Sequence, residues 1–296
     1  MRSLLFVPAD SERKIAKGLA SAADALILDL EDSVGPGNKA TARRMCVEVL
    51  SSAQSRAAGK KLFVRMNALD TPHALDDLAA VARARPAGIM LPKCRGGEDA
   101  GLVSNYLTAL EARDGLPQGG IGILPIVTET GAAMFGLGTY FKTAQTPAIP
   151  RLAGMLWGAE DLAADVGALG NRGANGRYTP AFELARTLCV LGATAASTIA
   201  VDGVYTDFRD MKGLEAEALE GLHMGYSAKA AIHPDQIETI NRAFTPTPEA
   251  LAWAQRVLAA FEASPGAGVV SIDGKMIDIP HLKAARRVIA RSKAMS

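Results

Sequence analysis

The feature that most constrains this chain is a repeated pattern of short apolar runs, each ending in polar or charged residues and followed by a stretch with helical character. A strand buried in a parallel sheet reads as a continuous apolar run, and parallel strands place their following residues at the same face of the sheet. We therefore predict an α/β fold, a (β/α)8 TIM barrel whose chemistry lies at that face. The runs are 3–7, 25–28, 62–64, 88–91, 122–127, 153–157, 198–201 and 230–232.

Composition narrows the class of protein. A chain of 296 residues that is 49% hydrophobic can bury one large core, so one main domain is expected. With 32 Lys and Arg against 31 Asp and Glu, there is no basic field for a nucleic acid. Three widely spaced cysteines without a CxxC motif suit a reducing compartment, the cytoplasm. No apolar stretch approaches ~18 residues, so neither a membrane span nor export is expected.

The chain is expected to divide after residue 244. Residues 1–244 form the predicted catalytic barrel, and a Thr-Pro-Thr-Pro segment then breaks the repeat. Residues 245–296 are predicted to form an extension with a helix, a hairpin around Asp273 and Gly274, and a basic terminal helix. The hairpin is interpreted as a lid or a subunit contact. Two longer loops, 141–151 and 167–178, are expected to lack regular structure and to shape the mouth of the barrel.

Two acids follow neighbouring predicted strands and are candidate metal ligands. Glu129 and Asp161 should point into the same mouth, where two carboxylates with open positions suit Mg2+. Alternatively, each acid stabilises the N-terminus of the helix that follows it. Glu160 is an alternative ligand to Asp161, and the spacing does not separate the two.

Arg65 ends its predicted strand and could grip a carboxylate with two parallel hydrogen bonds. The alternative is a salt bridge across the barrel top to Asp29, Glu31 or Asp32. Asp29 and Glu31 are interpreted either as groups that orient the waters of a metal or as counter-ions to Arg65.

Other basic residues receive weaker interpretations. Lys93 at a strand end invites a Schiff base, but beside a carboxylate pair we interpret it as an electrostatic partner. Lys39 and Arg43 open a helix after a glycine-rich turn and could hold a phosphate, although a solvated basic face is the default interpretation. His233 is interpreted as a structural hydrogen-bonding residue.

Several short motifs resemble one family across nearly the whole chain. The sequence is similar to the citrate lyase beta subunit and the wider CitE-like, malyl-CoA lyase and HpcH/HpaI aldolase superfamily. The motifs are Leu-Phe-Val-Pro at 5–8, Leu-Asp-Leu-Glu-Asp-Ser-Val at 28–34, Val-Arg-Met-Asn at 64–67, Met-Leu-Pro-Lys at 90–93, Thr-Glu-Thr at 128–130, Gly-Ala-Glu-Asp-Leu-Ala at 158–163, Ile-His-Pro-Asp-Gln at 232–236 and Gly-Lys-Met-Ile-Asp-Ile-Pro at 274–280.

The resemblance implies an oligomeric TIM barrel, a homotrimer or a dimer of trimers, that uses Mg2+, with Mn2+ as the alternative ion. It implies that Glu129 and Asp161 bind the metal and that Arg65 binds the substrate and an enolate. It also implies that Asp278 reaches over a neighbouring subunit's site as an acid or base. Our candidate catalytic residues are Arg65, Asp278, Asp29 and Glu31. The candidate cofactor-binding residues are Lys39, Arg43 and Lys93.

The function predicted from these observations is a Mg2+-dependent carbon-carbon lyase acting on a 3-hydroxyacyl-CoA such as malyl-CoA or citramalyl-CoA. Its products would be an acyl-CoA and a 2-oxo acid. The alternatives are a citryl-thioester lyase subunit of a citrate lyase complex, or a malate synthase or malyl-CoA thioesterase. The segment 226–229 departs from the Gly-Phe-x-Gly-Lys pattern of the family, and the loop 141–151 looks long, which affects the expected thioester binding and substrate size.

Overall fold

The computed structural model describes residues 1–142 and 149–293, and it confirms the predicted barrel. Eight parallel strands follow one another in the order β5-β4-β3-β2-β1-β8-β7-β6. Each predicted apolar run overlaps one of them. The strands are β1 (Ser3–Pro8), β2 (Ala25–Asp29), β3 (Lys61–Arg65), β4 (Gly88–Leu91), β5 (Gly122–Pro125), β6 (Met155–Leu156), β7 (Ala200–Asp202) and β8 (Ala228–Ala231).

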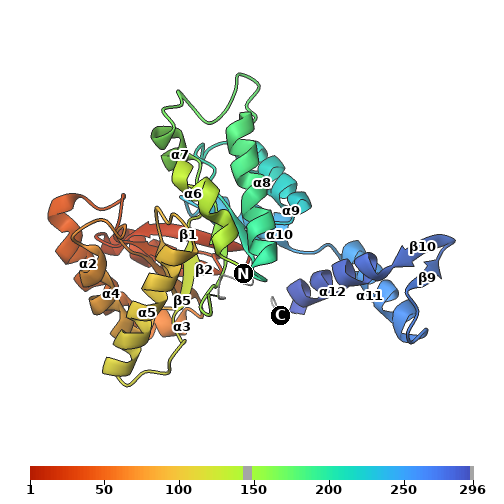
Figure 1. Cartoon of the computed structure of the whole chain (residues 1–296), viewed down its shortest axis with the longest axis horizontal. Helices are drawn as coiled ribbons and strands as arrows, with labels where there is room; N and C mark the ends of the chain where they lie inside the picture. Colours follow the sequence, from red (N-terminus) through yellow and green to blue (C-terminus); the bar gives the residue numbers. More distant parts are fainter. Residues whose placement is uncertain (143–148, 294–296) are drawn as a thin grey trace.

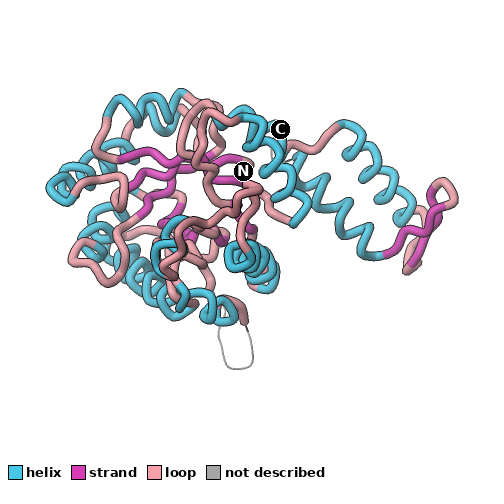
Figure 2. Tube along the Cα trace, turned by 90° about the horizontal axis from the view of Figure 1, so that it is seen from above, coloured by secondary structure: helices cyan, strands magenta, loops and turns pink. Residues whose placement is uncertain are grey.

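Helices surround the strands on the outside of the barrel (Figures 1 and 2). Ser11 caps the first helix by accepting a hydrogen bond from the backbone nitrogen of Lys14 at 3.4 Å. The helices are α1 (Glu12–Ala20), η1 (Pro36–Asn38), α2 (Lys39–Ser51), α3 (Ala53–Ala57), α4 (Ala74–Val81), η2 (Ala82–Ala84), α5 (Gly97–Arg113), α6 (Gly131–Gly136), η3 (Leu137–Thr139), α7 (Glu160–Asp165), α8 (Pro180–Ala195), α9 (Met211–Met224) and α10 (Gln236–Phe244).

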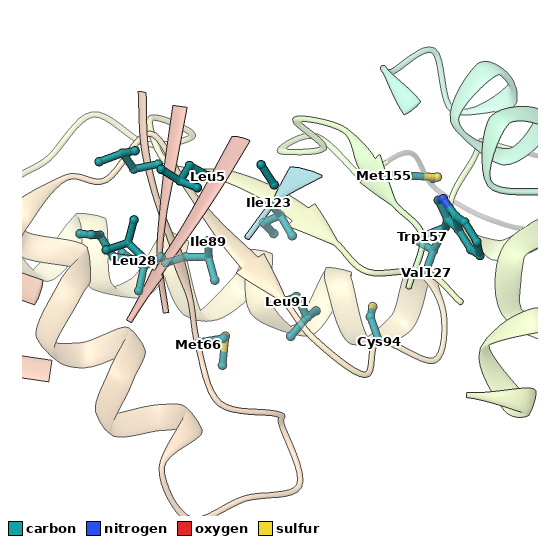
Figure 3. Close-up of a cluster of buried hydrophobic side chains, with 14 of the residues drawn as sticks. Leu5, Leu28, Met66, Ile89, Leu91, Cys94, Ile123, Val127, Met155 and Trp157 are labelled. Carbon is teal, nitrogen blue, oxygen red and sulfur yellow. The ribbon is translucent and has the colours of Figure 1, made fainter. Parts of the chain in front are cut away.

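The strands bury both faces, which explains why they read as continuous apolar runs. Leu4 and Ile27 point into the barrel, where they pack in one cluster. Their neighbours Leu5 and Leu28 point outward and pack in the larger cluster between strands and helices (Figure 3). The period of two along each strand thus separates an inner core from an outer one.

The barrel closes between β5 and β6 through isolated bridges rather than a continuous ladder. Ile123 pairs with Leu152, and Ile126 pairs with Leu156. The backbone nitrogen of Val127 also donates to the carbonyl of Leu156 at 2.8 Å. This seam lies directly below the chain segments that carry Glu129 and Asp161.

The extension begins with α11 (Pro248–Glu262), continues through β9 (Val269–Ile272) and β10 (Lys275–Asp278), and ends with α12 (Ile279–Lys293). It projects away from the barrel (Figures 1 and 2). The two strands are antiparallel. The extension has a buried cluster of its own, made of Ala254, Val257, Phe261, Ile272, Ile277, Leu282 and Ala285.

Three details differ from the sequence predictions. The helix predicted to begin at Lys39 ends at Ser51, and the side chain of Ser52 caps a separate helix, α3, by accepting from the backbone nitrogen of Ser55. The short helix α7 already begins at Glu160, so Asp161 lies within its first turn and not before it. The loop 167–178 contains one isolated bridge, between Arg172 and Tyr178.

The predicted loop 141–151 lies partly outside the described residues. Within the part of the chain that is described, no helix has the length and apolar character needed to cross a membrane.

Candidate active site

The C-terminal ends of the barrel strands open into a cavity of about 230 Å3. This is the face where the sequence predicted the chemistry. The charged residues that line it are Asp29, Arg65, Glu129, Glu160 and Asp161.

Glu129 follows β5 and is only 2% exposed. Its Oε2 accepts a hydrogen bond from the backbone nitrogen of Lys93, while its Oε1 receives none from any described residue. Burial raises the pKa of Glu129 to about 8, and the negative charges of Asp161 and Glu31 add to this rise. A Cβ at Gly158 would lie 3.0 Å from the Cγ of Glu129, so glycine lets the chain after β6 pass this close.

Asp161 and its neighbour Glu160 have different surroundings although both lie in the first turn of α7. Asp161 Oδ1 lies 3.3 Å from Lys93 Nζ, inside the charged group of the mouth. Glu160 Oε1 instead accepts a hydrogen bond from Asn171 Nδ2 at 2.7 Å. The geometry therefore favours Asp161 over Glu160 as the carboxylate that acts together with Glu129.

No capping hydrogen bond accounts for these acids, although Asp161 lies in the first turn of α7, where a negative charge is favourable. The N-cap of α6 is Thr130, whose side chain accepts from the backbone nitrogen of Ala133 at 3.1 Å. The N-cap of α7 is Ala159, and α7 has no side-chain capping hydrogen bond. Glu129 and Asp161 thus remain available for another role.

The donor set fits a hard divalent cation. Among the described residues, no three His, Cys, Asp or Glu side chains are grouped to hold a metal. A cation at Glu129 and Asp161 would have two protein carboxylates and would take its other oxygens from water or substrate, a coordination that Mg2+ accepts. The unpartnered Oε1 of Glu129 agrees with this arrangement.

Arg65 is fixed by the acids after β2. Its Nε and Nη2 each donate to Asp29 at 2.7 Å, and its Nη1 lies 3.0 Å from Glu31. The salt bridge offered as the structural alternative is therefore present. Burial alone would raise the pKa of Asp29, but the Arg65 guanidinium outweighs it and holds that pKa below its usual range. Phe6 covers the guanidinium, with its ring centroid 5.0 Å from Cζ.

Lys93 lies between two acids of the mouth, Glu31 after β2 and Asp161 in α7. Its Nζ lies 2.6 Å from Glu31 and 3.3 Å from Asp161. Although burial alone would lower the pKa of Lys93, the hydrogen bond to Glu31 and the nearby acids raise it. A raised pKa makes an amine a poor Schiff-base nucleophile, so the contacts agree with an electrostatic role. Its role in binding a cofactor stays a prediction.

Lys39 and Arg43 lie outside the cavity and have partners of their own. Lys39 Nζ donates to the carbonyls of Leu30 and Glu31 at 2.8 and 2.7 Å. Arg43 Nε donates to Asp77 at 2.8 Å. Lys39 thus braces the segment after β2, and Arg43 joins α2 to α4. The contact of either residue with a cofactor stays a prediction.

Asp278 lies on the projecting hairpin rather than at the mouth of its own barrel, and its Oδ1 is 2.5 Å from His281 Nδ1. That contact holds the pKa of Asp278 below its usual range. The action of Asp278 on a neighbouring site stays a prediction.

One feature was missed by sequence reasoning. A groove of about 800 Å3 lies between α1 and α10 and shares Phe6 and Ile232 with the active-site cavity. Three exposed cations of α1, Arg13, Lys14 and Lys17, border it. The signal was available as basic residues clustered on one helix directly after β1.

The family model for HpcH/HpaI aldolase/citrate lyase matches residues 2–234, and a model for C-C bond lyases of the TIM-barrel fold matches residues 181–296. The chain belongs to the HpcH/HpaI aldolase/citrate lyase family. It is accordingly an enzyme, a carbon-carbon lyase similar to the citrate lyase beta subunit.

Members of the HpcH/HpaI family with known names are similar over nearly the whole chain. A (3S)-malyl-CoA thioesterase from Cereibacter sphaeroides is 35% identical, covering 100% of this chain and 95% of the relative. The mitochondrial citramalyl-CoA lyase of Rattus norvegicus is 32% identical, covering 97% and 85%. A solved structure of CitE from Mycobacterium tuberculosis in complex with magnesium, acetoacetate and coenzyme A superposes with a TM-score of 0.77 at 32% identity, covering 99% of this chain and 98% of that one.

Proposed function

We propose that this enzyme is a Mg2+-dependent lyase that cleaves a 3-hydroxyacyl-CoA, such as malyl-CoA or citramalyl-CoA, into an acyl-CoA and a 2-oxo acid. The observation that carries the proposal is the mouth of the barrel, where the carboxylates of Glu129 and Asp161 lie in one cavity with Arg65. The CitE structure that contains magnesium, acetoacetate and coenzyme A supports it.

In this reaction a negative charge develops on a thioester enolate and is then removed by protonation. The substrate hydroxyl loses a proton, its electron pair forms the carbonyl of the 2-oxo acid, and the pair of the broken carbon-carbon bond enters a thioester enolate. Protonation of the enolate carbon gives the acyl-CoA. Mg2+ held by Glu129 and Asp161 would supply Lewis-acid chemistry at the substrate oxygens. Arg65, already oriented by Asp29, places a fixed positive charge near the enolate.

The proton transfers need an acid or base beside the substrate hydroxyl and the enolate carbon. We propose Asp278 of a neighbouring subunit in a homotrimer or a dimer of trimers. The carboxylate of Asp278, held against His281, would accept the hydroxyl proton and later return it to the enolate carbon.

The groove between α1 and α10 is the place we propose for the CoA arm. It shares the lining residues Phe6 and Ile232 with the cavity. The cations of Arg13, Lys14 and Lys17 suit phosphate groups at its rim.

The test is an assay of the purified chain with malyl-CoA and citramalyl-CoA, with and without Mg2+. We expect glyoxylate or pyruvate, trapped as the phenylhydrazone, in equal amount to acetyl-CoA, loss of both products with EDTA, and their return with added Mg2+. Full release of oxo acid in the presence of EDTA would refute metal dependence, and no release under any condition would refute the lyase itself.

A second candidate is hydrolysis of a malyl thioester at the same site, favoured by the 35% identity to a (3S)-malyl-CoA thioesterase. Acetyl-CoA and glyoxylate are supplied together while free thiol is followed with a disulfide reagent. Release of free CoA marks hydrolysis, as in a malate synthase or thioesterase, and accumulation of malyl-CoA marks a lyase. Turnover of free CoA esters by the isolated chain would exclude a citryl-thioester subunit that needs a citrate lyase complex.

A further inference from the structure

The walls of the active-site cavity differ in character around the barrel. Charged side chains come from the ends of β2, β3 and β5 and from the start of α7. The ends of β6, β7, β8 and β1 and the loop before α8 supply an apolar wall. Its side chains belong to Leu156, Tyr178, Val204, Ile232 and Phe6.

The charge of this cavity is also unevenly distributed. Among the described residues that line it, Arg65 is the only cation, and Asp29 and Glu31 already pair with it. Lys93 lies at the charged side and pairs with Glu31 and Asp161, and Arg172, which stacks on Tyr178, pairs with Glu217. An additional carboxylate on a substrate would therefore meet no unpaired positive side chain on the apolar wall.

Tyr178 is held rigidly in that wall. It is 8% exposed and meets Trp157 edge to face, with the ring centroids 5.0 Å apart. The Cζ of Arg172 lies 3.8 Å from the centroid of the Tyr178 ring. Trp157 is fully buried behind it, and its Nε1 donates to Asp202 at 2.7 Å.

The same contacts close into a ring of six residues. Arg172 donates to Glu217, which also accepts from Lys229 Nζ at 2.9 Å. Lys229 in turn donates to Asp202 at 3.0 Å. Asp202 also accepts the hydrogen bond from Trp157, which completes the ring. Because Lys229 and Asp202 are completely buried, moving this ring would expose or separate buried charges. Tyr178 is thus a fixed boundary of the cavity.

The charged side, the apolar wall and the α1–α10 groove offer a substrate different kinds of contact. These differences orient a 3-hydroxyacyl-CoA in the cavity. The carboxylate and hydroxyl oxygens belong with the charged side, and the thioester arm leaves past Phe6 and Ile232 into the α1–α10 groove. The remaining substituent of the hydroxyl-bearing carbon then faces Tyr178 and Val204.

We propose that Tyr178 is a specificity-determining residue, positioned by Arg172, that selects a hydrogen or methyl substituent on the hydroxyl-bearing carbon and rejects a carboxymethyl substituent. The proposal rests on the proposed lyase function. Malyl-CoA, citramalyl-CoA and citryl-CoA form the matching series, with hydrogen, methyl and carboxymethyl at that carbon. A methyl group gains apolar contact, whereas a carboxylate loses its water and meets no unpaired cation on this wall.

The experiment compares kcat/KM for the three thioesters. For the wild type we expect citryl-CoA to be at least on the order of 100-fold poorer than citramalyl-CoA. Tyr178→Ala opens the wall to water and should lower the ratio of kcat/KM for citramalyl-CoA to that for citryl-CoA about tenfold or more. Tyr178→Phe should leave this ratio unchanged. Arg172→Gln should shift the ratio in the same direction as Tyr178→Ala. Arg177→Gln, on the same loop with only 3.9 Å ion pairs, is the matched control and should leave it unchanged.

A binding measurement separates this inference from the lyase function. In a Trp253→Phe background, the fluorescence of Trp157 reports the binding of pyruvate and oxaloacetate with Mg2+ present. We expect pyruvate to bind at least tenfold more tightly. If no thioester is cleaved, the lyase proposal fails. The ratio of the affinities for pyruvate and oxaloacetate then still tests whether the apolar wall discriminates against a carboxylate. Equal affinities, citryl-CoA turnover within tenfold of citramalyl-CoA, or a Tyr178→Ala ratio like that of the wild type would each overturn the inference.

Discussion

At the scale of single residues, Asp161 and Glu160 provide a matched pair for testing the metal site. We expect Asp161→Asn to weaken Mg2+ binding and lower activity on the order of 100-fold, because one of two anionic oxygen ligands becomes a neutral amide. Glu160→Gln should retain both within about twofold, because Glu160 binds Asn171 instead. Calorimetric Mg2+ titration and oxo acid release measure the two effects. An equal loss in the Glu160 variant would reverse the assignment.

Arg65 permits a second residue-scale prediction. Arg65→Lys keeps the charge but loses the paired hydrogen bonds to Asp29, so the remaining ammonium is poorly oriented. We expect kcat/KM to fall by about 100-fold or more. Arg44→Lys, on the exposed side of α2, is the control and should retain the wild-type value. Circular dichroism checks that both variants fold, and an Arg65→Lys variant of normal activity would exclude the electrostatic role.

The residues near the mouth show what sequence could and could not predict. Strand-end position was enough to place Glu129 and Asp161 in one cavity, because parallel strands share a direction. It could not assign the partners of Lys39 and Arg43, because these depend on the path of the segment after β2 and on α4. Tyr178 was missed as a cavity residue because it lies in a loop without periodicity.

At the scale of elements, a buried ionic network joins β7 and β8 to α8 and α9. Asp202 pairs with both Lys229 and Arg186 in complete burial. We expect Asp202→Asn to lower the free energy of unfolding by about 3–5 kcal/mol, because two buried cations each lose one of their two carboxylate partners. Asp76→Asn, at a 70% exposed side chain, should cost less than about 1 kcal/mol. Urea unfolding measures both, and similar costs would contradict this account.

The same network predicts a pH dependence. Burial opposes ionisation of Asp202, but Lys229 and Arg186 outweigh it and lower its pKa from 3.8 to about 2. The folded pKa lies below the unfolded value, so the contribution to stability is present above about pH 4 and is lost as the pH falls through 2. Its size is on the order of 2 kcal/mol. Between pH 5 and 2, the free energy of unfolding should fall more steeply for the wild type than for Asp202→Asn. Parallel curves of this free energy against pH would contradict the assignment.

Element boundaries were less predictable than element types. Apolar runs located all eight strands because both faces of each strand are buried. The run 153–157 became only the two-residue β6, because the chain after it turns away to begin α7. The break at Ser52 depends on a side-chain cap that a run of helix-forming residues conceals.

At the scale of the whole molecule, the position of Asp278 far from its own barrel mouth makes the site testable by mixing subunits. Glu129→Gln and Asp278→Asn should each be nearly inactive alone. If Asp278 acts on a neighbour, mixed oligomers should regain roughly a quarter of the wild-type activity, because random pairing brings an intact Glu129 and an intact Asp278 together in one of four sites. Mixing after dissociation and reassembly, with sedimentation to establish the oligomer, tests this. No recovery in mixed oligomers would place Asp278 outside the reaction.

The extension supports this experiment because it has its own buried cluster around Phe261 and Ile277. It is joined to the barrel through the short connection between α10 and α11. The division at residue 244 stays a prediction, and separate unfolding of the barrel and the extension would be its signature.

The sparse hydrogen bonding between β5 and β6 has a consequence for how the barrel responds to its surroundings. Amides along this line should open at a lower free energy than those between β1 and β2, where a continuous ladder connects the strands. Glu129 and Asp161 lie on opposite sides of the line, so any ion that binds both binds only the shut form and slows amide exchange there by mass action. The integrity of the barrel wall at this joint is therefore expected to follow the free concentration of divalent cation.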